Sequence, residues 1–224
     1  MNYLGGIVDI YSGDGEWDLT HATGLRCLIH KATEGTTFTD PGLAHAMRCA
    51  AMVGALRGAY HFGRSSSSGK EQADRFYDLV RPLGADIRLI LDLEGALDAP
   101  KTMTTEQARD FLLRIEERDG RSAMLYGGLS KTRERMRAAD EATREVFGRA
   151  ELWLAAYSEP STKLKAPAPW TRWTLHQYTD GKVSPGDEAT YPKRFPGFHG
   201  ADLSFSIYET PEEFRASWLP PKSA

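Results

Sequence analysis

Short apolar segments with the two-residue period of a β-strand recur along the chain, separated by segments with the longer apolar period of a helix. The strand-like segments are residues 7–10, 25–31, 56–62, 87–94, 123–126, 152–157 and 174–178. The helix-like segments are residues 40–52, 132–147 and 210–218, with two more that begin near residues 68 and 104. Alternation over five strand–helix units predicts a parallel sheet with right-handed crossovers, and roughly eight strands in this length predict a closed α/β barrel. Helical patterns thin out after Phe147, so we expect loops to join the last three strands.

Helix starts are marked by side chains that satisfy free backbone N–H groups. Three Ser/Thr-x-x-Glu/Gln patterns begin at Ser68, Thr104 and Thr210 and predict capping boxes. Asp40 followed by Pro41 predicts an N-cap and the first helical residue of the 40–52 helix.

Composition narrows the class of protein. The chain has 224 residues, with 41% hydrophobic and 26% charged residues, which is typical of one folded globular domain. We expect a single domain over residues 1–219 and a tail at 220–224, with no wall-binding module. A net charge of −3 argues against a strongly basic nucleic-acid binder, and no apolar run is long enough to cross a membrane. No Lys or Arg precedes Arg26, so no export signal is expected and the chain would reach an outside target by release or by another delivery system.

The strongest chemical signal is a pair of carboxylates at the end of an apolar strand. Asp92 and Glu94 close the segment 89–94, and the strand period places both on one face with Cα atoms about 7 Å apart. Like charges this close push their pKa values apart, so one group can hold a proton for general acid catalysis. The alternative is two solvated carboxylates at a strand end.

Two further acidic residues and several aromatic ones lie at strand ends. Asp9 ends the first strand, where it could equally pair with Lys31, and Asp202 opens the segment 202–205. Aromatic faces beside carboxylates suit sugar rings, although an aromatic side chain taken alone more often belongs to the core. These aromatic residues are Tyr60, Tyr126, Trp153, Tyr157 and Tyr178.

Other motifs are incomplete. Residues 63–70 have the wrong glycine spacing for a phosphate-binding loop, and the six histidines lack a zinc-ligand spacing, so we expect no metal and no cofactor. His61 and His176 could be site residues or hydrogen-bonded strand histidines. Cys27 and Cys49 cannot form a disulfide framework and are interpreted as buried thiols.

Short motifs over most of the chain together resemble the family 25 glycoside hydrolases, the lysozyme-type N-acetylmuramidases. They follow one another at residues 6–9, 31–35, 40–41, 58–62, 91–94, 152–157, 177–178 and 202–205. The resemblance implies an irregular TIM-like barrel of five β/α units closed by three further strands. The sequence differs from the family pattern at Tyr11, at His176 and in a longer segment over 184–200.

The resemblance also implies an activity, namely cleavage of the β-1,4 bond from N-acetylmuramic acid to N-acetylglucosamine in peptidoglycan. It makes Glu94 the general acid/base and Asp92 the group that orients the substrate acetamide, with Asp9 and Asp202 as further acidic site residues. These roles imply that the raised pKa belongs to Glu94 and that Asp92 stays ionised. The implied substrate-binding residues are Lys31, Tyr60, Tyr126, Trp153, Tyr157 and Gln177. A bare catalytic domain, acting as a monomer on glycan strands, fits a phage endolysin or a delivered effector. The alternative is a catalytically inactive, glycan-binding barrel.

Overall fold

Eight strands close into a barrel in the computed structural model, which describes residues 3–97 and 99–219. Seven are parallel to one another: β1 (Leu4–Ile10), β2 (Cys27–Glu34), β4 (Leu56–Phe62), β5 (Arg88–Asp92), β6 (Met124–Gly128), β7 (Leu152–Ala155) and β8 (Leu175–Thr179). The eighth, β9 (Asp202–Ser206), runs antiparallel to both β8 and β1 and closes the ring. A two-residue strand, β3 (Phe38–Thr39), adds to the edge of β2. The predicted α/β barrel closed by further strands is therefore confirmed.

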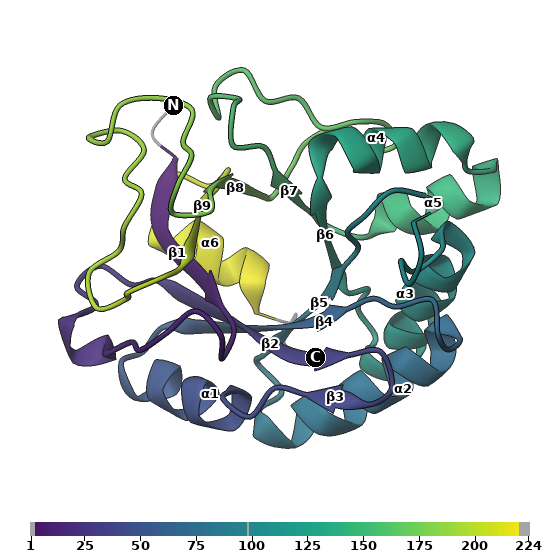
Figure 1. Ribbon diagram of the computed structural model, residues 1–224, viewed down its shortest axis with the longest axis horizontal. Coiled ribbons are helices and arrows are strands. Elements are labelled where there is room, and N and C mark those ends of the chain that lie inside the picture. Colours follow the sequence, from purple (N-terminus) through teal and green to yellow (C-terminus); the bar gives the residue numbers. More distant parts are fainter. Residues whose placement is uncertain (1–2, 98, 220–224) are drawn as a thin grey trace.

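Helices surround the barrel between its strands (Figure 1). They are α1 (Leu43–Met52), α2 (Gly69–Val80), α3 (Thr105–Asp119), α4 (Leu129–Ala138) and α5 (Glu141–Arg149), with short 3-10 turns η1 (Leu19–His21) and η2 (Arg81–Leu83). As predicted, the strands from β7 to β9 are joined by loops, and helix α6 (Pro211–Trp218) follows. The predicted tail at 220–224 lies outside the described residues.

Helix starts follow the local sequence, with two corrections. The capping boxes at Ser68, Thr104 and Thr210 are present as predicted. The helix predicted over 132–147 is instead two helices, because Asp140 stops the first and caps the second by accepting the Thr143 N–H at 2.7 Å.

The second correction concerns Asp40, which does not occupy the N-cap position of α1. Helix α1 begins at Leu43, and Asp40 is buried. Asp40 Oδ1 accepts the Gly42 N–H at 2.9 Å, while Oδ2 accepts the N–H and hydroxyl of Ser12. Asp40 therefore ties the start of α1 to the loop after β1.

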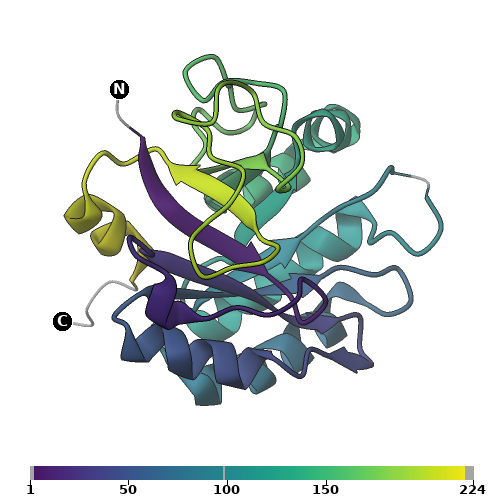
Figure 2. The ribbon, with the colours of Figure 1, turned by 60° about the vertical axis from the view of Figure 1, so that its left-hand side comes forward.

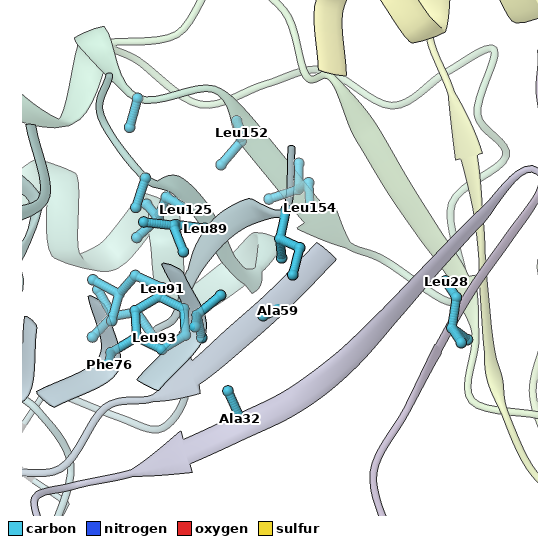
Figure 3. Packing of buried hydrophobic residues seen from close by; sticks show 14 of the residues in the cluster. Leu28, Ala32, Ala59, Phe76, Leu89, Leu91, Leu93, Leu125, Leu152 and Leu154 are labelled. Carbon is cyan, nitrogen blue, oxygen red and sulfur yellow. The ribbon is translucent and has the colours of Figure 1, made fainter. Parts of the chain in front are cut away.

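Alternate strand residues form two apolar layers. Outward-facing residues such as Leu89, Leu91 and Leu125 pack against helix residues such as Phe76 (Figure 3). Inward-facing residues fill the barrel, among them Ile7, Cys27, Ile29, Leu56, Ile90, Met124 and Leu175. This division follows from the two-residue period of a strand.

Helix α6 closes one end of the barrel (Figure 2). Phe214 and Trp218 belong to the inner apolar layer, and the Trp218 indole donates to the Arg57 carbonyl at 2.8 Å. Arg121 donates to the carbonyls of Ser217 and Trp218 and holds the helix in place. The amino ends of the parallel strands are thus filled, and their carboxyl ends remain for a site.

Neither cysteine is positioned for chemistry. Cys27 is buried inside the barrel, where burial raises its thiol pKa well above the ordinary value. Cys49 lies on α1 and is only partly buried, which corrects the expectation of two buried thiols.

We therefore expect Cys27→Ser/Cys49→Ser to keep its activity if it folds. Thiol titration of the native wild-type protein should modify Cys49 first, with a count of two after denaturation without reductant. A lower count would indicate a disulfide, and a folded but inactive double variant would indicate thiol chemistry.

Candidate active site

A cavity of about 340 Å³ opens at the carboxyl ends of the parallel strands, the usual position of sites in such barrels. It contains all four predicted carboxyl groups, which come from β1, β5, the turn after β5, and β9. Its lining residues are Asp9, Ile10, Tyr11, Asp14, Lys31, Glu34, Tyr60, Phe62, Arg64, Asp92, Glu94, Tyr126, Trp153, Gln177 and Asp202. Strands far apart in the sequence therefore bring the predicted residues together.

Gln177 on β8 connects the two acidic residues of β1 and β9. The strand register places Asp9 opposite Asp202. The buried Gln177 amide nitrogen donates to both carboxyl oxygens of Asp9 at 3.1 and 3.0 Å and to Asp202 Oδ2 at 3.2 Å. The Gln177 carbonyl accepts the hydroxyls of Tyr126 and Tyr157, each at 2.8 Å. Gln177 therefore fixes a wall of four side chains.

Two of the predicted binding residues lie behind this surface. Tyr157 reaches the site through Gln177 and is not a lining residue. Trp153 is almost fully buried, with its indole donating to Ser204 Oγ at 3.0 Å and its ring 4.5 Å from that of Tyr126. Trp153 supports the Tyr126 ring and offers little surface of its own.

Burial and mutual repulsion raise the pKa values of the Asp9–Asp202 pair. The pKa of Asp9 lies well above its ordinary range because of burial first and the Asp202 charge second. Burial, followed by the charges of Asp14 and Asp180, raises the pKa of Asp202 to about 7. The pair therefore retains a proton close to neutral pH.

This proton makes stability depend on pH. Because the folded pKa of Asp202 is raised, the folded state binds more protons than the unfolded state between about pH 4 and 7, and stability falls as pH rises through this window. We compare the stability difference between Asp202→Asn and the wild type at two pH values. This difference should favour the variant more at pH 8 than at pH 5, by about 1 kcal/mol or about 2–4 °C in Tm. Thermal unfolding at both pH values measures this. Asp187→Asn is the control, since the Asp187 pKa is lowered by backbone hydrogen bonds and should give no difference in this window. An equal Tm change at both pH values would contradict the prediction.

Asp92 and Glu94 share the cavity but differ in exposure. Asp92 ends β5 and is buried, and among the described residues its Oδ1 has no hydrogen-bond partner. Glu94 follows at the solvent-exposed mouth. Desolvation raises the Glu94 pKa, opposed by a hydrogen bond with Tyr126 and by the charge of Lys31.

The order of the two pKa values differs from the sequence prediction. Burial, then the Glu94 charge, raises the pKa of Asp92 well above its ordinary range. In the protein without substrate, Asp92 is therefore the better proton holder, and the expectation that it stays ionised is wrong for this state. The strand end that presents Asp92 to the cavity also removes it from water.

Both histidines considered as site residues lie outside the cavity. His61 is buried between Thr33 Oγ1 at 2.7 Å and Gln72 Oε1 at 3.0 Å, and burial lowers its pKa to about 4. His176 contacts Ser161 Oγ and the Ala156 carbonyl, and burial likewise lowers its pKa to about 4. Both are neutral structural residues at neutral pH.

The remaining polar wall contains residues that sequence reasoning did not assign to the site. Lys31 Nζ lies 2.6 Å from Glu34 Oε2, so it pairs with Glu34 and not with Asp9. Arg64, two residues beyond β4, donates to the other oxygen of Glu34 through Nε at 2.8 Å and Nη2 at 2.6 Å. Phe62 could have been found because it shares the inward face of β4 with Tyr60. Arg64 lies in a loop, where no sequence period predicts which way a side chain points. Tyr11 and Asp14 also lie in a loop and were missed for the same reason.

The described part of the chain has neither a metal-ligand cluster nor a membrane-spanning helix. No group of three or more His, Cys, Asp or Glu side chains there is arranged to hold a metal ion. No helix among residues 3–97 and 99–219 has the length and apolar character needed to cross a membrane.

The chain is similar to known proteins in sequence and in fold. Residues 8–187 match the family model described as glycosyl hydrolases family 25. Lysozyme M1 of Streptomyces globisporus is 27% identical over 182 residues, which are 77% of this chain and 60% of that protein. The chain thus spans less than two thirds of the length of this curated relative.

Solved structures share the fold over nearly the whole chain. A muramidase from Trichobolus zukalii is 26% identical, with a TM-score of 0.71 and coverage of 94% of this chain and 96% of the other. A bacterial lysozyme from Streptomyces coelicolor has a TM-score of 0.75 with coverage of 94% of both chains, and at 24% identity it supports the fold alone.

Proposed function

Since this chain belongs to family 25 of the glycosyl hydrolases, we propose that it hydrolyses peptidoglycan at the β-1,4 bond from N-acetylmuramic acid to N-acetylglucosamine. The observation that carries this proposal is the Asp92–Glu94 pair in the cavity, one group buried with an unpartnered oxygen and the other at the mouth. The names of a lysozyme and a muramidase among its relatives support the substrate class.

Glu94 is the proposed general acid. Its exposed position at the mouth lets its carboxyl O–H reach the glycosidic oxygen that departs when the C1–O bond breaks. Water then attacks C1 and returns a proton to Glu94, which restores the starting state. The Tyr126 side chain, placed by Gln177, lines the same cavity as Glu94.

Asp92 is the proposed partner of the substrate acetamide. A buried polar atom without a partner is costly, and Asp92 Oδ1 lies where a ligand N–H would satisfy it. An acetamide N–H that donates to this oxygen favours the ionised form of Asp92, so substrate binding moves the shared proton toward Glu94. The ionised Asp92 then strengthens the acetamide oxygen as the nucleophile that attacks C1 while the bond to the leaving oxygen breaks, which forms an oxazolinium-like intermediate. The water that later attacks C1 breaks the bond between C1 and the acetamide oxygen and restores the acetamide.

The other predicted residues shape the cavity around the reacting sugar. We assign Asp9 and Asp202, joined by Gln177, to stabilising the positive charge that develops at C1. Tyr60 and Tyr126 line the cavity and offer aromatic surface to sugar rings. Action of the barrel as a monomer, without cofactor, remains a prediction, as does its action on the cell wall.

Mass spectrometry of digested, purified peptidoglycan tests the proposal. We expect new reducing ends on N-acetylmuramic acid, and none from Glu94→Gln under the same conditions. Reducing ends on N-acetylglucosamine, or only free amino termini, would replace the muramidase assignment by a glucosaminidase or an amidase. Binding to the wall without any product would favour the inactive, glycan-binding barrel.

A further inference from the structure

Two cations in the cavity share a single carboxylate. Lys31 Nζ and the Arg64 guanidinium both donate to Glu34, at 2.6 Å and at 2.8 and 2.6 Å. Among the described residues, Nη1 of Arg64 donates no hydrogen bond. The three side chains are about one third exposed or less, and all line the cavity. We call Lys31, Glu34 and Arg64 the cationic triad; it carries one net positive charge.

Aromatic rings hold the cationic triad in place. Lys31 Nζ lies 4.9 Å from the ring centre of Phe62, 5.3 Å from Phe38 and 5.9 Å from Tyr11. The Arg64 guanidinium carbon lies 4.5 Å from the ring centre of Phe62. Such rings attract cations and restrict their motion, so the triad is ordered before any ligand arrives.

The rest of the cavity has the opposite character. Its other charged lining residues are all acidic: Asp9, Asp14, Asp92, Glu94 and Asp202. A ligand with an anionic group is repelled from these residues, and the cationic triad is where that group is most favourably bound. A guanidinium with free donors matches the geometry of a carboxylate.

From this charge separation we infer that the cationic triad binds a carboxylate carried by the muramyl residue of the glycan strand. The inference rests on the proposed function, and it concerns specificity. N-acetylglucosamine has no carboxylate, whereas N-acetylmuramic acid carries one on its lactyl ether or, when a peptide is attached, on that peptide. Binding this group beside Lys31 and Arg64 distinguishes the two alternating sugars and sets the direction in which the strand lies across Glu94.

Kinetics of Arg64→Gln on three substrates test the inference. The first is glycan strands with free lactyl carboxylates, the second is the same strands with these carboxylates converted to amides, and the third is strands that carry their peptides. We expect KM to rise about tenfold or more, with little change in kcat, on whichever of the first and third substrates supplies the carboxylate. On the amidated strands wild type and variant should have the same KM. Arg64→Lys, which keeps the charge but not the fork, should recover part of the loss.

The controls separate this role from a structural one. Arg114→Gln removes an arginine of similar exposure that is paired with Asp74 and Glu117 on the helices outside the barrel, and should change no KM. A loss on the first substrate alone identifies the lactyl carboxylate, and a loss on the third alone identifies the peptide. An equal loss on amidated strands, or no loss on any substrate, would overturn the inference while leaving hydrolysis intact. If the wild type released no muramyl reducing ends from any substrate, the proposed function would fail and the inference with it.

Discussion

Replacing Glu94 by Gln is expected to lower the hydrolysis rate by about 10²–10⁴-fold, with a much smaller effect on glycan binding. The amide keeps the size of the side chain at the cavity mouth but has no proton to give to the leaving oxygen. Because Glu94 is solvent-exposed, the substitution should leave the fold and its stability nearly unchanged. Steady-state kinetics on purified peptidoglycan, with circular dichroism as the folding control, measure both effects.

The matched control for this result is Glu106→Gln, which changes an exposed glutamate near the start of α3. It should retain wild-type rates. A folded Glu94→Gln variant with more than about one tenth of wild-type turnover would remove Glu94 from the role of general acid, because so small a loss is below the usual contribution of proton transfer.

Asp92→Asn is expected to lower kcat by about 10²–10³-fold through the loss of a negative charge beside the reacting acetamide. It should also move the alkaline limb of the pH–rate profile to lower pH. In the wild type, burial and the Glu94 charge make Asp92 the group that loses its proton last, so the pair holds one proton to a higher pH than Glu94 would alone. In the variant the last proton belongs to Glu94, whose pKa is raised less.

Since the two carboxyl groups act as a unit, the double variant should be little worse than either single variant. Asp187→Asn, in the exposed loop before β9, is the control for removing one carboxylate. Near-wild-type turnover in Asp92→Asn, or an alkaline limb that stays in place, would refute this division of roles even if the protein cleaves the predicted bond.

The sequence predicted the barrel because each strand carries its own period and each helix its own cap. Asp140 is an example that this reasoning missed. An aspartate within a long, polar helical pattern can be an ordinary helical residue or an N-cap, and only the structure shows that Asp140 caps a new helix. The strand period also predicted that Asp92 and Glu94 share one face, and both line the cavity. The strand period could not predict which charged side chains contact one another.

The ion-pair partners in the site were not predicted correctly because they depend on strand register and on the conformation of loops. The choice of Glu34 over Asp9 as the partner of Lys31 follows from a contact three residues away along the same strand. Arg64 joins that contact from a loop of serines that has no periodic signal. The pKa order of Asp92 and Glu94 likewise depends on how deeply each lies, which spacing alone does not determine.

The antiparallel strand β9 has a consequence for synthesis. It places Asp202 opposite Asp9, so the cavity needs residues from both ends of the described chain. A nascent chain emerging from the ribosome has no second acceptor for Gln177 until β9 appears, and β1 and β8 meanwhile expose unpaired edges. Such distant contacts make folding slow. The proposed catalytic centre is therefore incomplete until β9 has emerged and paired with β1 and β8.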